Sequence, residues 1–200
     1  MEPVQKAEPA VSKLTVRQSI LARRKQLGTE EISTWSQRIT DLIMADPIFH
    51  KARVIMGYAP CHNEVDISLL IQAALAQGKQ VLLPVTQWEA HRLLPVEITR
   101  YPEDLVPGRL GILEPPLSTV PPWSLERIDL VIVPAVAFDI HGYRLGYGQG
   151  FYDRFLVQLL PETSVFGVAF SFQIVNSVYP EAHDCALPVI VSENGVISRS

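Results

Sequence analysis

Apolar residues recur at helical spacing from residue 12 to residue 45, among Lys, Arg and Gln residues. Such spacing is typical of amphipathic helices. Gly28 interrupts the pattern where a first helix would end, and Ser12 and Thr29 are residue types that cap helix N-termini. The pattern therefore predicts two helices, and the second ends at Asp46, before a proline.

Strand-like and helical segments alternate over the rest of the chain. The expected strands are short apolar runs at residues 53–58, 81–85, 128–133, 165–170 and 189–191. Residues 66–77 and 150–160 are the expected helices between them. Strands that alternate with helices indicate a parallel sheet with crossover connections, so we predict an α/β fold with a mixed, largely parallel sheet.

The segment from residue 87 to residue 123 is richer in Pro and Gly and suits loops and edge strands, for example residues 93–98. The 200-residue chain shows no internal repeat and no linker. We therefore expect residues 12–200 to form a single domain, and residues 1–11 to be a frayed tail.

Composition removes several classes of function. The chain has 17 basic and 21 acidic residues, for a net charge of -4, so it lacks the basic excess typical of nucleic-acid-binding proteins. Cys61 and Cys185 have no CxxC spacing, which suits a reducing compartment, and no signal peptide or membrane anchor is visible. We expect a cytoplasmic monomer that binds neither nucleic acid nor membranes.

A glycine-rich turn follows the apolar run 128–133 and is the most informative stretch. Gly146, Gly148 and Gly150 allow the backbone to approach a ligand, and the helix expected after them would turn N–H groups toward an anion. Arg144 can donate forked hydrogen bonds to phosphate, and Asp153 can ligate Mg²⁺. The glycine spacing alone is weak evidence for phosphate binding, because it also fits an ordinary turn. The spacing matches neither the Walker A motif nor the dinucleotide-binding fingerprint.

These residues resemble the signature of the 5-formyltetrahydrofolate cyclo-ligase family. The resemblance rests first on Phe138, Asp139, Gly142, Arg144, Leu145, Gly146, Gly148, Gly150, Tyr152, Asp153 and Arg154. Further matches in the family's order are Lys13 with Arg17, residues 64–66, 78–84 and 111–115, and His183 with Asp184. Gln149, Phe151 and Pro188 depart from the residues common in the family at those positions.

Membership would imply a three-layer α/β domain, related to sugar-phosphate isomerases and CoA transferases, that closes 5-formyltetrahydrofolate to 5,10-methenyltetrahydrofolate with release of ADP and phosphate. By resemblance, ATP is held by Lys13, Arg17, Arg144, Leu145, Gly146, Tyr147, Gly148, Gln149, Gly150, Phe151, Tyr152 and Asp153. Arg144 and Tyr152 would be catalytic, Glu64 and Tyr152 would bind the folate, and Asp153 and Asp184 would hold Mg²⁺.

Other interpretations stay open at this point. Lys13 and Arg17 fit cations on a solvated helix face, and Asp66 fits a helix cap. The chain also fits a paralogue that binds nucleotide or folate without catalysis, or a related ATP-dependent enzyme with another substrate. A zinc site from Cys61, His62, His183 and Cys185 is a weaker alternative, because their spacing is not that of paired zinc ligands.

Overall fold

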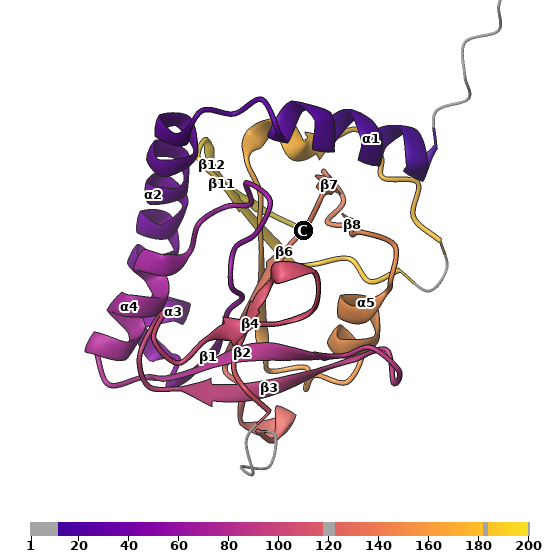
Figure 1. Cartoon of the computed structure of the whole chain (residues 1–200). Coiled ribbons are helices and arrows are strands. Elements are labelled where there is room, and N and C mark those ends of the chain that lie inside the picture. The colour runs from indigo at the N-terminus through magenta and orange to yellow at the C-terminus, as the bar shows by residue number, and fades with distance from the viewer. Residues whose placement is uncertain (1–11, 118–122, 182–183, 200) are drawn as a thin grey trace, which may run out of the picture.

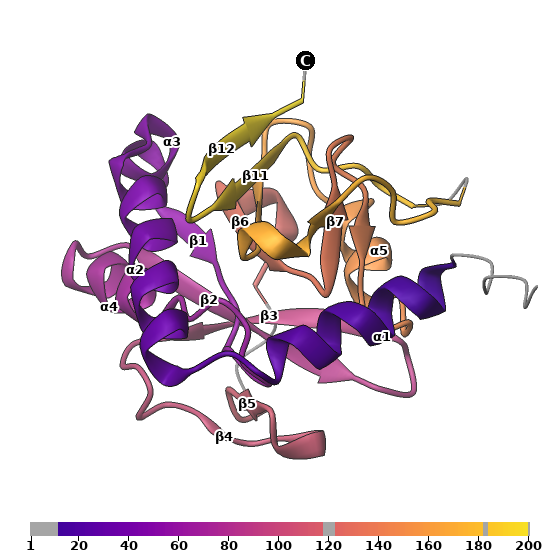
Figure 2. The same cartoon turned by 90° about the horizontal axis from the view of Figure 1, so that it is seen from above.

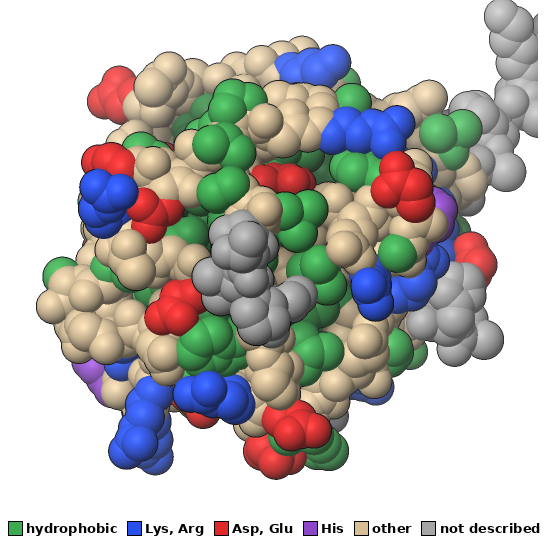
Figure 3. Space-filling view, turned by 60° about the horizontal axis from the view of Figure 1, so that its bottom comes forward, with side chains coloured by type: hydrophobic (Ala, Val, Ile, Leu, Met, Phe, Trp, Pro, Cys, Tyr) green, Lys and Arg blue, Asp and Glu red, His purple; other side chains and the backbone are tan. Residues whose placement is uncertain are grey.

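The computed structural model of the chain describes residues 12–117, 123–181 and 184–199. The predicted tail, residues 1–11, lies outside them. Within the described residues, no helix has the length and apolar character needed to cross a membrane. The face in Figure 3 carries basic and acidic side chains close to apolar ones, in line with the near balance of 17 basic and 21 acidic residues.

A seven-stranded sheet in the order β12-β11-β9-β6-β1-β2-β3 forms the centre of the molecule (Figure 1). Its strands are β1 Val54–Met56, β2 Gln80–Gln87, β3 Arg92–Ile98, β6 Leu130–Pro134, β9 Ser164–Val168, β11 Val189–Ser192 and β12 Gly195–Ser198. All neighbours are parallel except the two edge pairs, β2 with β3 and β11 with β12. The predicted α/β class with a mixed, largely parallel sheet is confirmed.

Helices cover both faces of this sheet. The helices of the described residues are α1 Lys13–Arg24, α2 Thr29–Ala45, α3 Pro47–Lys51, α4 Ser68–Ala76 and α5 Phe151–Leu156. In Figure 1, α2 and α4 lie on one side and α5 on the other. Side chains of a strand alternate between these sides: Leu130 and Ile132 belong to the core beneath α2 and α4, and Val131 and Val133 to the core beneath α5. A strand buried on both faces has to be apolar throughout.

Two small sheets and three 3₁₀ turns complete the fold of residues 12–117, 123–181 and 184–199. They are the sheet of β7 Ala137–Asp139, β8 Arg144–Leu145 and β10 Ile174–Val175, the hairpin of β4 Val106–Pro107 and β5 Leu113–Glu114, and η1 Arg109–Gly111, η2 Leu125–Arg127 and η3 Ser171–Gln173. Helix α1 packs beside β7 (Figure 2). These short strands escaped the sequence analysis, because two or three residues give no readable periodicity.

Three predicted helix boundaries were wrong. Helix α1 ends at Arg24, well before Gly28, and Gly28 rather than Thr29 caps α2: its N–H donates to Glu31 Oε2 at 2.9 Å. Helix α4 begins at Ser68 with Ile67 as its N-cap residue, so the predicted cap, Asp66, lies one residue too early, although its Oδ1 accepts from Ser68 N–H at 2.8 Å. At the starts of α2 and α4, these hydrogen bonds from a backbone N–H to a carboxylate replace the helical hydrogen bonds that the first residues of a helix lack.

Helix α5 is also shorter than the predicted 150–160. After Leu156 the chain tightens into turns in which Gln158 N–H donates to Phe155 O at 3.1 Å and Leu159 N–H to Leu156 O at 3.2 Å. Such bonds to the third preceding residue are typical of a helix that is ending. Helix α5 therefore has only six residues, and Gly150 of the glycine-rich loop is its N-cap.

Gly167 of β9 lies directly against a buried aromatic ring, and this contact yields a prediction for stability. A Cβ there would come within 2.6 Å of Phe138 Cζ and 3.1 Å of Leu187 Cδ1. Because overpacking of a core costs about 1–3 kcal/mol, Gly167→Ala should lower the free energy of unfolding by that amount. Urea denaturation measures it; an unchanged midpoint would mean that the Phe138 ring moves aside without penalty.

Candidate active site

A pocket of about 560 Å³ opens at the carboxyl ends of the parallel strands. Its wall includes Tyr58 just after β1, Thr86 near the end of β2, and Pro134 and Ala135 at the end of β6. Carboxyl ends of parallel strands are the usual ligand-binding edge of an open α/β sheet. Every site residue predicted from the sequence lines this pocket: Lys13, Arg17, Glu64, residues 144–153 and Asp184.

The glycine-rich loop forms one side of the pocket and follows β8 directly. Gly148 and Gly150 have φ values of 96° and 66°, in the left-handed region that side chains disfavour. A Cβ at Gly146 would come within 2.6 Å of Arg144 Nη1 and would displace the guanidinium group from its present position. The glycines therefore let the loop pass beside a guanidinium group and turn into α5.

Three cations, Lys13, Arg17 and Arg144, line the pocket together with this loop. Arg17 Nε donates to Gly146 O at 2.9 Å. Arg144 is buried, its Nη2 lies 2.8 Å from Asp153 Oδ1, and its Nε is buried with no hydrogen-bond partner among the described residues. Lys13 Nζ lies 2.7 Å from Asp184 Oδ2 and 2.9 Å from Glu181 Oε1. A cluster of cations beside backbone N–H groups is suited to a polyanion such as a nucleotide phosphate chain.

Lys13 and Arg17 are thus not free cations on a solvated helix face. Both reach residues more than a hundred positions along the chain, Arg17 at Gly146 and Lys13 at Asp184. The alternative interpretation of these two residues was wrong, because it treated α1 as an isolated surface helix. Helix α1 instead brings both side chains to the pocket.

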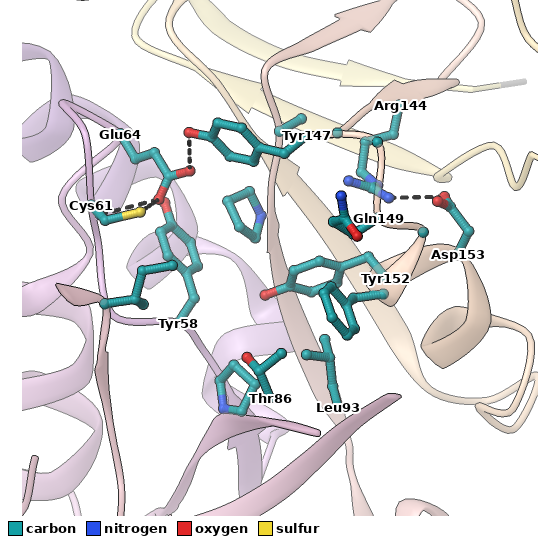
Figure 4. A pocket seen from close by; sticks show the side chains of 18 of the residues that line it. Tyr58, Cys61, Glu64, Thr86, Leu93, Arg144, Tyr147, Gln149, Tyr152 and Asp153 are labelled. Carbon is teal, nitrogen blue, oxygen red and sulfur yellow. Dashed lines mark hydrogen bonds and ion pairs between the residues drawn. The ribbon is translucent and has the colours of Figure 1, made fainter. Parts of the chain in front are cut away.

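The opposite side of the pocket carries the buried carboxylate of Glu64 (Figure 4). Glu64 is 7% exposed; its Oε2 accepts from Cys61 N–H at 3.2 Å, and its Oε1 lies 3.2 Å from Tyr147 Oη. Burial raises the pKa of Glu64, while the positive charge of Arg24 and the hydrogen bonds from Cys61 and Tyr147 counteract part of the increase. Burial also raises the pKa of the Cys61 thiol to about 12, so this cysteine stays a neutral thiol.

Tyr152 and an apolar wall lie between these two sides. The Tyr152 hydroxyl is buried without a hydrogen-bond partner in the described structure, and burial raises its pKa. The Trp88 ring meets Phe151 edge to face at 5.2 Å, and Leu93 and Ile112 extend the wall. An unpartnered polar atom inside an otherwise apolar wall is typical of a site that completes its hydrogen bonds with a ligand.

Several lining residues were missed by the sequence analysis. Thr86 and Trp88 had a readable signal, because they follow the predicted strand 81–85 toward its carboxyl end. Ile112 and Glu114 had none beyond the proposed family match. Glu114 Oε1 accepts from Thr86 Oγ1 at 2.7 Å, which ties the segment 109–114 to β2.

The predicted metal residues do not form a protein-only metal site. Asp153 pairs with Arg144 and Asp184 with Lys13, and residues 12–117, 123–181 and 184–199 contain no group of three His, Cys, Asp or Glu placed to hold an ion. The zinc alternative gains no support there, and His183, one of its four residues, lies outside the described part of the chain.

The fold and the pocket define an α/β protein in which a cation-lined glycine-rich loop and a buried carboxylate face one pocket. Comparison with known proteins narrows this class. The model of the 5-formyltetrahydrofolate cyclo-ligase family matches residues 9–193, and the chain belongs to that family.

Individual relatives agree. The chain is 34% identical over 180 residues to the 5-formyltetrahydrofolate cyclo-ligase of Escherichia coli, which spans 88% of this chain and 98% of that protein. A Mycolicibacterium smegmatis protein of the same name is 33% identical over 149 residues, 73% of this chain and 77% of the relative. The solution structure of Aquifex aeolicus 5,10-methenyltetrahydrofolate synthetase superposes with a TM-score of 0.80 at 32% identity, covering 93% of this chain and 92% of the other.

Proposed function

We propose that the chain closes 5-formyltetrahydrofolate to 5,10-methenyltetrahydrofolate in an ATP-dependent reaction that releases ADP and phosphate. The observation that carries the proposal is the placement, in one pocket, of a cation-lined glycine loop and a buried carboxylate beside an apolar wall. The first half suits ATP and the second suits a reduced pterin. Membership in the family supports the pairing.

The reaction needs activation of an amide, because the N5-formyl group is unreactive toward N10. The formyl oxygen attacks the γ-phosphorus of ATP and ADP leaves. N10 then attacks the phosphorylated imidate carbon and loses its N–H proton to water, and phosphate departs with the former formyl oxygen. In this sequence the protein positions two reactants and stabilises charge on the transferring phosphoryl group. Arg144, Arg17 and Lys13 supply that positive charge, and the loop 146–150 supplies backbone N–H groups.

Magnesium fits this arrangement as a partner of the nucleotide. Mg²⁺ is usually held by one or two carboxylates together with substrate phosphates and water, so it needs no dedicated cage of protein ligands. Asp153 lines the pocket beside Arg144 and is the first candidate, and Asp184, beside Lys13, is the second. When bound, the ion would reduce the negative charge of the phosphate chain.

Glu64 and Tyr152 face the folate in this proposal. A reduced pterin presents N–H donors at its edge and an apolar face, and a carboxylate and an aromatic wall complement these two surfaces. Glu64 supplies the acceptor, the Tyr152 hydroxyl is free to bond the ligand, and Trp88 supplies the wall.

Replacing Glu64 tests the folate half separately. Glu64→Gln keeps the shape but removes the charged acceptor, so kcat/KM for 5-formyltetrahydrofolate should fall about 10- to 100-fold, the effect of losing a charged hydrogen bond, with ATP affinity unchanged. Asp66→Asn is the matched control, because Asp66 is not among the residues that line the pocket and its Oδ1 accepts from Ser68 N–H. Unchanged folate turnover in Glu64→Gln would favour a related enzyme with another substrate.

The direct test follows methenyltetrahydrofolate absorbance after purified protein, Mg-ATP and 5-formyltetrahydrofolate are mixed, with ADP measured alongside. Both signals should grow together and vanish without ATP. Binding of ATP or folate with neither signal would point to the non-catalytic paralogue instead. The single-domain, monomeric and cytoplasmic assignments stay predictions from the sequence.

A further inference from the structure

Arg24 is the last residue of α1 and has no role in the reaction proposed above. Its side chain is nevertheless only 1% exposed and reaches the buried carboxylate of Glu64. Its Nη2 donates to Tyr147 Oη and lies 3.9 Å from Glu64 Oε1. Its Nη1 donates to Ala135 O, after β6, at 3.4 Å. Arg24 thus connects three segments of the pocket wall: the glycine loop, the loop after β1 and the end of the central strand.

A buried arginine is energetically expensive unless its charge and its donors are matched. Its carboxylate partner is also nearly fully buried, since the side-chain exposures of Arg24 and Glu64 are 1% and 6%. The Tyr147 hydroxyl lies between them, accepting from Arg24 and bonding Glu64 Oε1 at 3.2 Å. Tyr147 is therefore held on the folate side of the pocket through its tip, although its backbone belongs to the glycine loop.

We propose that Arg24 is a positioning residue for the cyclo-ligase reaction, which fixes the Glu64 carboxylate and the Tyr147 hydroxyl in one arrangement. This inference rests on the proposed function. Through Tyr147, Arg24 also connects the glycine-rich loop to the Glu64 carboxylate, so that ATP and the folate contact one rigid wall. Displacing such a wall by about 1 Å is sufficient to reduce turnover on the order of 100-fold.

The ionisation of Glu64 gives this role a measurable signature. The groups that face Glu64 are Arg24 from α1, Tyr58 and Cys61 after β1, Tyr147 from the glycine loop and Tyr152 from α5. Arg24 is the cation among the groups that act on it, and its charge lowers the pKa that burial raises. Without Arg24, Glu64 should take up a proton at higher pH than in the wild type.

The experiment compares Arg24→Met, which removes the charge, with Arg24→Lys, which keeps it but loses the planar fork. In Arg24→Met, kcat/KM should fall on the order of 100-fold at neutral pH and its acid limb should move to higher pH. In Arg24→Lys the limb should stay near its wild-type position, with a loss of about tenfold for the missing forked bond. Arg23→Met is the matched control, because Arg23 is exposed and lies over the Phe172 ring at 4.4 Å.

A second readout separates this inference from the proposed function. The Glu64 carboxyl is titrated by carbon-13 NMR, with its signal assigned by loss in Glu64→Gln, and its pKa should be higher in Arg24→Met than in the wild type. If the wild type has no cyclo-ligase activity, the proposed function fails, and the titration alone decides whether Arg24 governs Glu64. An acid limb and a Glu64 pKa that stay fixed in Arg24→Met overturn the inference, whatever the loss of activity.

Folding of the variants is checked by thermal denaturation. If Arg24→Met does not fold, the test uses Tyr147→Phe and Arg24→Lys instead. Tyr147→Phe removes the bridging hydroxyl and Arg24→Lys removes the planar guanidinium, and neither leaves a large cavity. The double variant Arg24→Lys/Tyr147→Phe is then compared with the two single variants. A fold-loss in its kcat/KM that is smaller than the product of the two single losses supports a shared arrangement. Independent, multiplicative effects contradict it.

Discussion

Replacing Arg144 by methionine is expected to reduce kcat by about a thousandfold, the scale seen when an enzyme loses one preorganised group that stabilises a transferring phosphoryl charge. Arg144 is 8% exposed, and its Nε has no hydrogen-bond partner in the described structure. A buried guanidinium with a spare donor, aimed at a glycine loop, is prepared for a phosphate oxygen. The loss should appear in kcat with ATP, and 5-formyltetrahydrofolate affinity should change little.

Single-turnover kinetics with Arg144→Met measure this loss, because they separate phosphoryl transfer from product release. Arg127→Met is the matched control: its guanidinium lies over the Trp123 ring at 4.6 Å, much as Arg144 lies over Tyr152 at 5.3 Å, but outside the pocket. Full activity in Arg144→Met, with an unaltered ATP requirement, would exclude Arg144 from the reaction.

The centre of the sheet could be predicted from the sequence because strands such as β1 and β6 are buried on both faces and consist of continuous apolar runs. Residues 128–133 foretold β6, although the strand itself is Leu130–Pro134. Strands β7 and β8 could not be predicted in this way: they are two or three residues long and are defined by pairing with each other, at Ala137 with Leu145 and Phe138 with Arg144. Their conformation is set by tertiary contacts, which leave no period in the sequence.

The site was predictable to the extent that it is local in sequence. The loop 144–153 carries glycines, a cation and a carboxylate within ten positions, and its resemblance to a family drew in Lys13, Arg17, Glu64 and Asp184. Arg24 was missed because it is one of two adjacent arginines at a helix end, which usually lie on the surface. Only the fold shows that Arg23 points outward and Arg24 inward.

The carboxylate beside Arg144 gives the second large expected effect. Asp153→Asn should reduce Mg²⁺-dependent turnover by at least about a hundredfold while the protein stays folded, because a charged ligand to a hard cation is replaced by a neutral one. The fold should survive, since the asparagine Oδ1 can still accept the bond that Arg144 Nη2 now makes to Asp153 Oδ1 at 2.8 Å. Circular dichroism and thermal denaturation check that survival.

The measurement that isolates the metal is a Mg²⁺ titration at fixed ATP. Asp153→Asn should need more Mg²⁺ for half-maximal rate, and the deficit should shrink at high Mg²⁺, because mass action offsets a weakened site. Asp184→Asn is the informative comparison, because Asp184 Oδ2 accepts a hydrogen bond from Lys13 Nζ at 2.7 Å. Loss of the Asp184 charge should disturb Lys13 and raise the KM for ATP more than it changes the Mg²⁺ requirement. Equal Mg²⁺ curves for Asp153→Asn and the wild type would assign Asp153 to holding Arg144 alone and leave the ion to the nucleotide and water.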